Sequence, residues 1–333
     1  MSKRKKRSTR KSGRKAAASS SGKKWFWLVA AMVLLALGVY QFFPDEGSQS
    51  NRKGYAHPQA GDYCKREPLF PANYGLQSPL LIDLSQRQGI GLFILEARQG
   101  GRSLHLPQWD FMGPLGPYAL DEQGNIYLAP VPHVSLPPEA LRHQNRIYRI
   151  DGQTGEASLF VELPAADLPS SRNPFGVMGL AYDCDSQTLY ASSVAGSTPG
   201  EEKGRIYQID VQSKELLDSL QDMDVLGLGI FNHRRGKRLY LGLARKPEVY
   251  VIELSDKGRF SGEPGFAFSL QQLSGGQYEQ AHRIRFTRKP EMEIKAIEFN
   301  YTLMAASDPL RNIYLFDYNN KTDDWIFSDF HSQ

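Results

Sequence analysis

The sequence predicts an all-β fold, a five- or six-bladed β-propeller preceded by a single N-terminal transmembrane helix. Three observations predict this fold. An uncharged apolar run of sixteen residues begins at Trp25. From about residue 79, short apolar and aromatic segments alternate with turns rich in Gly, Asp, Asn and Pro. One unit of paired segments recurs along this region, which shows no long amphipathic helix.

The charge of the chain is unevenly distributed. The 333 residues include 40 Lys and Arg and 36 Asp and Glu, a formal net charge of +4. Eleven of the basic residues lie in residues 1–24, which contain no acid, so 29 basic and 36 acidic residues remain elsewhere. The bulk of the protein is therefore mildly acidic, and its overall charge does not indicate nucleic-acid binding. We expect residues 1–24 to form a disordered basic tail.

The apolar run reaches Phe43 when Gln41 is included, which makes residues 25–43 a candidate transmembrane helix. A helix of this length spans roughly 28 Å, close to the hydrocarbon core of about 30 Å. Trp25 lies at one end and Tyr40 near the other, as expected for aromatic residues at membrane interfaces. The preceding positive charges predict a cytoplasmic N-terminus and a periplasmic or extracellular C-terminal domain.

Two other interpretations of this run remain open. Residues 36–38 (Ala-Leu-Gly) offer small residues for signal-peptide cleavage, but they lie inside the apolar run and follow a long basic region. A buried core helix would need a polar face, which this segment lacks. We favour an uncleaved signal-anchor, with the lipid bilayer as the partner of residues 25–43.

Residues 44–78 are expected to be a linker and pre-propeller segment, and residues 79–333 the propeller. The recurring unit is an apolar segment, a turn with Asp or Asn, an aromatic segment, a loop and a second aromatic segment. Its copies occupy 116–160, 175–216, 226–254, 294–327 and, more faintly, 91–107. Each would be a small antiparallel sheet that buries both faces only by radial stacking. A sixth sheet fits within 255–293, because 265–270 and 282–288 resemble strands.

The best copy carries a family resemblance. Its segments NPFGV (173–177), LAYD (180–183) and RIYQID (205–210) resemble NHL repeats and the related gluconolactonase- and strictosidine-synthase-like propellers. The resemblance covers most of residues 79–330 and implies architecture more than function, because propellers include binding proteins and enzymes. The first functional hypothesis is a binding or scaffold module for an unknown protein partner, with no cofactor. The second is a calcium-dependent lactonase or arylesterase-type hydrolase with a central-channel site.

Antiparallel alternation places the loops between second and third strands on the same face as the crossings between sheets. The long loops 131–144 and 194–203 and the crossings 164–175 and 271–283 should therefore share one face. Long loops on a rigid scaffold often carry function, although ordinary variable loops are the alternative. The candidate binding residues are His133, His143, Arg172, Asn173, Glu201, Tyr278 and His282.

Two cysteines exclude a disulfide-rich scaffold and a four-cysteine zinc site. Cys184 falls in a turn on the face opposite the long loops, and Cys64 lies just before the first predicted sheet. An oxidising compartment permits a Cys64–Cys184 disulfide, which would fasten the pre-propeller segment to that face. Two free thiols are the alternative.

The resemblance also implies a metal site for the second hypothesis, because lactonase-type propellers hold a divalent metal in the central channel through Glu, Asn and Asp. Such oxygen ligands suit calcium. No spacing pattern selects the ligands; the candidates are Asn173, Asp224, Glu298 and Asp308. Asp121 and Asp183 instead suit turns, where their side chains bond the backbone.

The remaining chemistry-bearing residues form no catalytic motif. The seven histidines show no metal-binding spacing, and no nucleophile elbow or P-loop is present, so no catalytic residue is assigned. Arg283, Arg285 and Arg288 form a small basic cluster. Exposed strand arginines are the default interpretation of this cluster, and contact with an acidic partner is the alternative.

Overall fold

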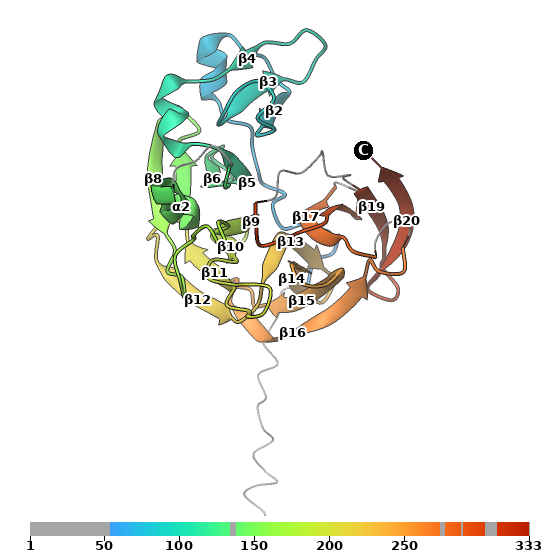
Figure 1. Ribbon diagram of the computed structural model, residues 1–333. Coiled ribbons are helices and arrows are strands. Elements are labelled where there is room, and N and C mark those ends of the chain that lie inside the picture. Colours follow the sequence, from blue (N-terminus) through green and yellow to red (C-terminus); the bar gives the residue numbers. More distant parts are fainter. Residues whose placement is uncertain (1–53, 134–137, 274–276, 288, 304–311, 333) are drawn as a thin grey trace, which may run out of the picture. The chain divides into compact units, whose positions relative to one another are not determined.

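The computed structural model describes residues 54–133, 138–273, 277–287, 289–303 and 312–332 (Figure 1). These residues form a five-bladed β-propeller, whose five antiparallel sheets follow one another along the chain. The first sheet has three strands, β2 (Leu80–Asp83), β3 (Phe93–Glu96) and β4 (Ser103–Leu104). The second contains β5 (Leu115–Leu120), β6 (Ile126–Pro130), β7 (Arg146–Ile150) and β8 (Ala157–Glu162). The third contains β9 (Val177–Asp183), β10 (Thr188–Ser193), β11 (Arg205–Asp210) and β12 (Leu216–Gln221).

The fourth sheet contains β13 (Val225–His233), β14 (Gly236–Leu243), β15 (Glu248–Leu254) and β16 (Phe260–Ser269), with β1 (Gln59–Ala60) beside β13. The fifth contains β17 (Gln280–Phe286), β18 (Glu291–Ile297), β19 (Asn312–Asn319) and β20 (Asp324–Ser332). The short helices are η1 (Phe70–Tyr74), η2 (Pro107–Met112), α2 (Pro138–Leu141) and η3 (Arg142–Asn145).

The structure settles the number of sheets. The strand-like segment 265–270 lies mostly in β16, the outer strand of the fourth sheet, and 282–286 lies in β17, the inner strand of the fifth. The described residues between 255 and 293 therefore belong to the fourth and fifth sheets and form no sixth one. The predicted copy at 294–327 was one strand out of register, since residue 294 belongs to the second strand of its sheet.

No helix among the described residues is long and apolar enough to cross a membrane. The basic tail 1–24 and the expected anchor 25–43 both lie outside those residues.

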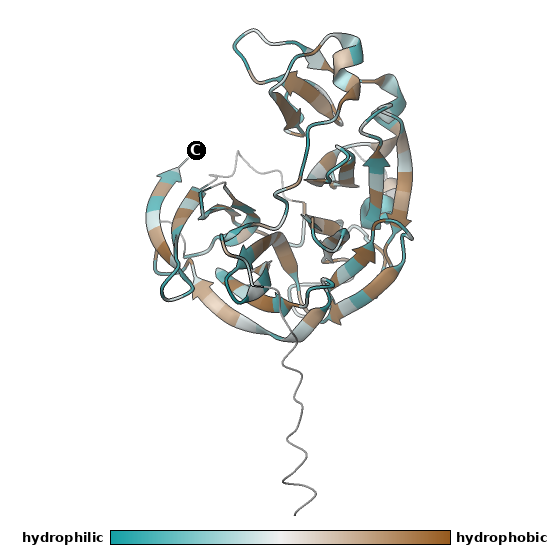
Figure 2. Ribbon diagram, turned by 180° about the vertical axis from the view of Figure 1, so that it is seen from behind, coloured by the Kyte–Doolittle hydropathy of each residue, from teal (hydrophilic) through white to brown (hydrophobic). Residues whose placement is uncertain are grey.

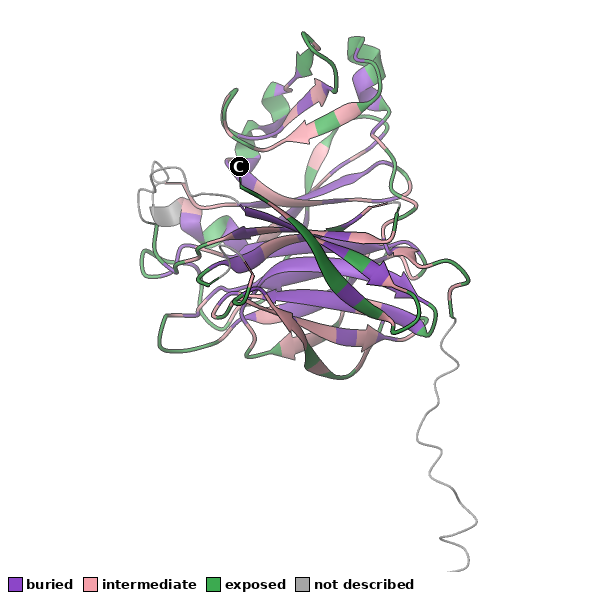
Figure 3. Cartoon of the chain, turned by 90° about the vertical axis from the view of Figure 1, so that its right-hand side faces the viewer, coloured by how far each residue is buried: buried purple, intermediate pink, exposed green. Residues whose placement is uncertain are grey.

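The inner strands β9 and β13 are buried along their whole length because sheets pack against both of their faces, whereas β5 and β17 contain half-buried or exposed residues. Every residue of β9 and β13 is buried, and Figures 2 and 3 show apolar, buried strands joined by polar, exposed turns. Glycines let neighbouring inner strands approach. A Cβ on Gly229 of β13 would lie 2.8 Å from Cγ2 of Ile284 in β17, which is too close for two carbon atoms.

Apolar clusters fill the spaces between consecutive sheets from the first to the fifth. The cluster between the fourth and fifth sheets is rich in aromatic side chains, and the Nε1 of Trp325 donates to the Oη of Tyr240 at 2.9 Å. Edge-to-face contacts such as that of Phe231 with Trp325, at 4.8 Å between ring centres, add to the stability gained from burial. These clusters join the five sheets into one compact unit.

Around the central channel, the fifth sheet contacts the second sheet directly, and the first sheet takes no part in this contact. Among the described residues, no apolar cluster joins the fifth sheet to the first. Instead β17 meets β5, since Arg283 donates to the carbonyl oxygen of Gly116 and Arg285 to the Oη of Tyr118, both at 3.3 Å. The first sheet packs on the second, and β5, β9, β13 and β17 surround the central channel.

A segment that precedes the expected boundary at residue 79 also contacts the propeller sheets. Residues 54–66, which we name the strap, run across one end of the channel. Their two-residue strand β1 pairs with the end of β13, and the amide of Gly61 donates to the carbonyl oxygen of Ile230 at 2.7 Å. A Cβ at Gly61 would lie 2.3 Å from Cγ2 of Ile230, so this close approach requires glycine.

Candidate functional site

The strand directions define two faces of the propeller. One face, which we name the loop face, carries the described residues of the connections 131–145, 194–204 and 244–247 and of the crossings 163–176, 222–224 and 270–279. The other face carries the tight turns and the strap, and we name it the strap face. Aspartate side chains bond the backbone of its turns, as predicted. For example, the Oδ1 of Asp121 accepts hydrogen bonds from the amides of Gln123 and Asn125, each at 2.9 Å.

On the loop face, the fully buried Asp224 organises a network from three parts of the chain. Its Oδ1 accepts hydrogen bonds from Ser197 and from the amide of Gly204, the latter at 2.9 Å. Its Oδ2 accepts the Nε of Arg245 at 2.8 Å and the hydroxyl of Tyr301. Burial, and then the hydrogen bond to Asp224, raise the pKa of Tyr301 well above its ordinary value. The network therefore holds the loops rigidly with one buried negative charge.

Asn173 meets Asp224 at the loop 194–204. Its Nδ2 donates to the carbonyl oxygens of Val194, at 2.7 Å, and Ser197, at 2.9 Å. Its Oδ1 accepts the amide of Phe175 at 3.0 Å. The structure thus brings two of the four candidate metal ligands to one loop, where both side chains serve to position it.

The donor set does not fit a calcium ion as arranged. The oxygens of Asn173 and Asp224 are committed to protein donors, and Arg245 supplies the positive charge that a metal would supply. Glu298 is exposed, and Asp308 lies outside the described residues. Within those residues, no group of three or more His, Cys, Asp or Glu side chains could hold a metal ion.

The candidate binding residues are spread over several loops. His143, Arg172, Glu201 and Tyr278 are exposed, and among the described residues Tyr278 is the most exposed large hydrophobic residue at 65%. The carboxylate of Glu201 lies 3.2 Å from the Nζ of Lys203. His133 is partly buried, whereas His282 lies in β17 and lines the channel, where residues 271–283 had been expected to form a crossing.

Several residues that form contacts on the loop face could not be identified from any local sequence pattern. Arg245 and Tyr301 reach Asp224 from 21 and 77 residues away. The buried Glu279 accepts hydrogen bonds from Asn312 and Tyr314, and burial together with the charge of Glu298 raises its pKa. Only the side-by-side arrangement of sheets brings these groups together.

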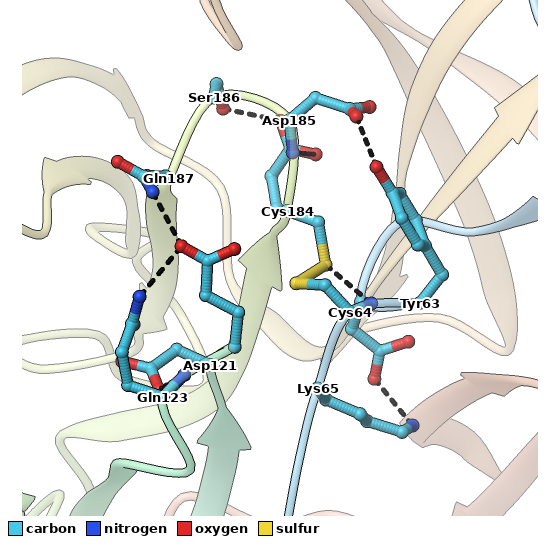
Figure 4. Close-up of a disulfide and its surroundings, with 12 residues drawn as sticks. Tyr63, Cys64, Lys65, Asp121, Gln123, Cys184, Asp185, Ser186 and Gln187 are labelled. Atoms are coloured by element: carbon cyan, nitrogen blue, oxygen red, sulfur yellow. Dashed lines mark hydrogen bonds and ion pairs between the residues drawn. A yellow bond between two sulfur atoms is a disulfide. The ribbon is translucent and has the colours of Figure 1, made fainter.

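On the strap face, the predicted disulfide joins Cys64 to Cys184 (Figure 4). The hydroxyl of Tyr63 donates to Oδ1 of Asp185 at 2.7 Å, and that of Tyr55 donates to Oδ2. Burial would raise the pKa of Asp185, but these two hydrogen bonds and the charge of Lys237 lower it below its ordinary value. The strap is therefore fixed by a covalent bond and by an ionised carboxylate.

The central channel holds a cavity of about 180 Å³ between the four inner strands. Asp62 and Lys65 of the strap line it on one side, and the Nζ of Lys65 lies 2.7 Å from Oδ2 of Asp62. Tyr118 and Arg285 contact each other in its wall, with the guanidinium 5.7 Å from the ring centre. The cavity is thus separate from the Asp224 network.

No protein-family model and no curated protein matches the sequence. Solved structures similar to it include the calcium-binding protein regucalcin from Agrobacterium tumefaciens, with 13% identity over 81% of this chain and 92% of that one, at a TM-score of 0.42. A candidate 6-phosphogluconolactonase from Bacteroides fragilis has 13% identity over 76% of this chain and 67% of that one, at 0.43. A luciferin-regenerating enzyme has 11% identity over 65% and 75%, at 0.41. The structural neighbours thus include regucalcin- and lactonase-like propellers, as the resemblance predicted, and at these values they carry no inference about activity.

Proposed function

We propose that this protein is a membrane-tethered, extracytoplasmic binding module that presents its loop face to a protein partner. The observation that carries the proposal is the position of the strap. Residues 54–66 follow the expected anchor and are held on the face opposite the long loops by the Cys64–Cys184 disulfide. A tether that joins the propeller at the strap face does not occupy the loop face.

The loop face also has the properties of a docking surface. Its exposed side chains include His143, Arg172 and Tyr278, which combine charge, hydrogen-bonding capacity and an aromatic ring. Hydrogen bonds from Asn173, the neighbour of Arg172, and to Asp224 fix the loop 194–204, so this part of the face loses little conformational entropy when a partner binds. The predicted partner contact is therefore made by exposed residues on a rigid base.

The second hypothesis, a calcium-dependent lactonase or arylesterase-type hydrolase, requires Asn173 and Asp224 to exchange their protein partners for a metal. Elemental analysis of the purified full chain, together with lactone and ester hydrolysis with and without chelator, tests it directly. Stoichiometric calcium with chelator-sensitive turnover would replace the binding proposal by the hydrolase.

The binding proposal is tested by site-specific photo-crosslinking in the native membrane. A crosslinker at Tyr278 should capture one protein in constant stoichiometry, and Arg172→Ala should weaken that capture. A crosslinker at Lys257, an exposed turn residue of the strap face, is the matched control and should capture none of it. Equal capture from both positions contradicts the assignment of the loop face. Protease accessibility in intact cells tests the extracytoplasmic location independently.

A further inference from the structure

The strap buries little of its own surface against the propeller. Within it, only Ala60 and Gly61 are buried. On the side of β13, its backbone donates two hydrogen bonds. The amide of Tyr55 donates to the carbonyl oxygen of His233 at 3.2 Å, and the amide of Gly61 donates to that of Ile230 at 2.7 Å. A chain segment with so little buried apolar surface opens at low cost unless a further bond fixes it.

Most of the other strap contacts lie at the turn between β9 and β10 (Figure 4). The amide of Cys184 donates to the carbonyl oxygen of Gly61 at 3.0 Å. The hydroxyl of Tyr63 donates to Asp185 at 2.7 Å, but Tyr63 is 49% exposed, so water competes for this hydrogen bond. The disulfide from Cys64 reaches the same turn, and water cannot replace it.

The two cysteines of this disulfide differ in exposure. Cys64 is partly exposed, whereas Cys184 is buried at 9% exposure. A dithiol reductant therefore reaches Sγ of Cys64 more easily, and Cys184 is then the leaving thiolate. The amide of Cys64 donates to Sγ of Cys184 at 2.9 Å, which stabilises negative charge on that sulfur as the bond breaks. The geometry thus favours reduction through attack on Cys64.

Reduction by a dithiol proceeds through two exchanges. A thiolate of the dithiol attacks Sγ of Cys64, so that a mixed disulfide forms and Cys184 leaves as a thiolate. The second thiolate of the dithiol then attacks its own partner sulfur in the mixed disulfide and releases Cys64. The dithiol loses two electrons and two protons and becomes a cyclic disulfide, and both cysteines end as thiols.

We propose that the Cys64–Cys184 disulfide is a redox latch, whose reduction by a dithiol releases the strap while the five sheets stay folded. Of the strap, Ala60 belongs to one apolar cluster and Cys64 packs against another, so the clusters remain when the strap leaves. Beyond the strap, the fully buried Phe70 keeps the chain attached between the first and second sheets. Because Asp62 and Lys65 line the channel cavity, release of the strap opens the cavity on this side.

Hydrogen–deuterium exchange of the full chain with and without dithiothreitol, measured by mass spectrometry, tests the latch. Amides in residues 54–63 should exchange at least tenfold faster after reduction. Amides in residues 237–254, which span β14 and β15, should change less than twofold. Alkylation of both thiols establishes that reduction is complete, and renewed oxidation should restore slow exchange in residues 54–63.

Tyr63→Phe is the matched control, because it removes one hydrogen bond of the strap but keeps the disulfide. In the oxidised form of this variant, residues 54–63 should exchange within threefold of the unchanged chain. The proposal is overturned if dithiothreitol does not reduce the folded chain, or if exchange in 54–63 is unchanged after complete reduction. It is also overturned if Tyr63→Phe accelerates exchange as much as reduction does, or if residues 237–254 lose protection together with the strap. None of these outcomes depends on the protein partner.

Discussion

Lys237 and Asp183 form a buried ion pair beneath the strap. The Nζ of Lys237 lies 2.5 Å from both carboxylate oxygens of Asp183, and the two side chains are 3% and 0% exposed. A second carboxylate, Asp185, lies 3.0 Å from the same nitrogen and accepts the hydroxyl of Tyr63 from the strap. One lysine thus links the third and fourth sheets to the strap.

Removing the lysine of this ion pair should strongly lower the stability of the folded protein. Lys237→Met leaves two carboxylates without their cation at a buried position, and we expect a loss of about 3–5 kcal/mol in the free energy of unfolding. Urea denaturation at pH 7 measures it. Lys257→Met, at an exposed turn, should change stability by less than about 0.5 kcal/mol. A loss at Lys237 no larger than that of the control would show that the pair does not stabilise the fold.

The disulfide should stabilise the folded protein because it links two residues that are far apart in the sequence. Cys64 and Cys184 are 120 residues apart, and loop-closure entropy predicts about 2–5 kcal/mol for a crosslink over such a separation. Cys64→Ser, Cys184→Ser and the double variant should lose the same amount, because each removes one and the same bond. Urea denaturation with and without reductant tests this, since reductant should destabilise only the unchanged chain. Losses that add in the double variant would point to separate packing roles of the two residues.

The sequence predicted the repeating sheets well where the units are complete, as at 175–216, because turn aspartates and paired aromatic strands recur there. At β17 it indicated a strand over 282–288 but failed to assign that strand to the inner position of the fifth sheet. It failed equally at β1, whose two residues are too few for any periodic signal. Where the sequence signal is this weak, packing between sheets determines whether the segment becomes a strand and which sheet it joins.

The candidate sites show the same limit. The structure places Asn173 and Asp224 at one loop, but the role of Asp224 follows from Arg245 and Tyr301, which no local pattern connects to it. Lys237 was not a candidate at all, because a lysine in the turn sequence Arg-Arg-Gly-Lys-Arg looks exposed. Contacts across sheets depend on register, and register is not readable from one sequence.

Acid should weaken the first sheet through Glu96. Its side chain is 1% exposed, and a hydrogen bond from the amide of Arg102 at 2.9 Å is the main cause that lowers its pKa from 4.5 to about 2. Because the folded-state pKa is depressed, this contribution is fully present above about pH 4.5 and is lost as the pH falls toward 2.

Glu96→Gln should therefore be less stable than the unchanged chain at pH 7, and the difference should shrink as the pH falls below 4.5. Urea denaturation at pH 7, 4 and 3 measures the difference. Glu263→Gln, at an exposed position of β16, should show no such pH-dependent difference. A difference for Glu96→Gln that stays constant with pH would exclude the carboxylate charge as its origin.

Two glycines of the fourth sheet allow a test of how closely this sheet packs against the fifth. A Cβ on Gly242 of β14 would lie 2.1 Å from the carbonyl oxygen of Ala281 in β17, whereas a Cβ on Gly265 of β16 would meet no atom within 4 Å. Gly242→Ala must push two strands of adjacent sheets apart and should cost about 1–3 kcal/mol in the free energy of unfolding. Gly265→Ala should leave stability unchanged or raise it by roughly 0.5–1 kcal/mol, because alanine has less backbone freedom to lose. Thermal unfolding of the pair separates steric from entropic effects, and equal destabilisation by both substitutions would contradict the packing of β17 on the fourth sheet.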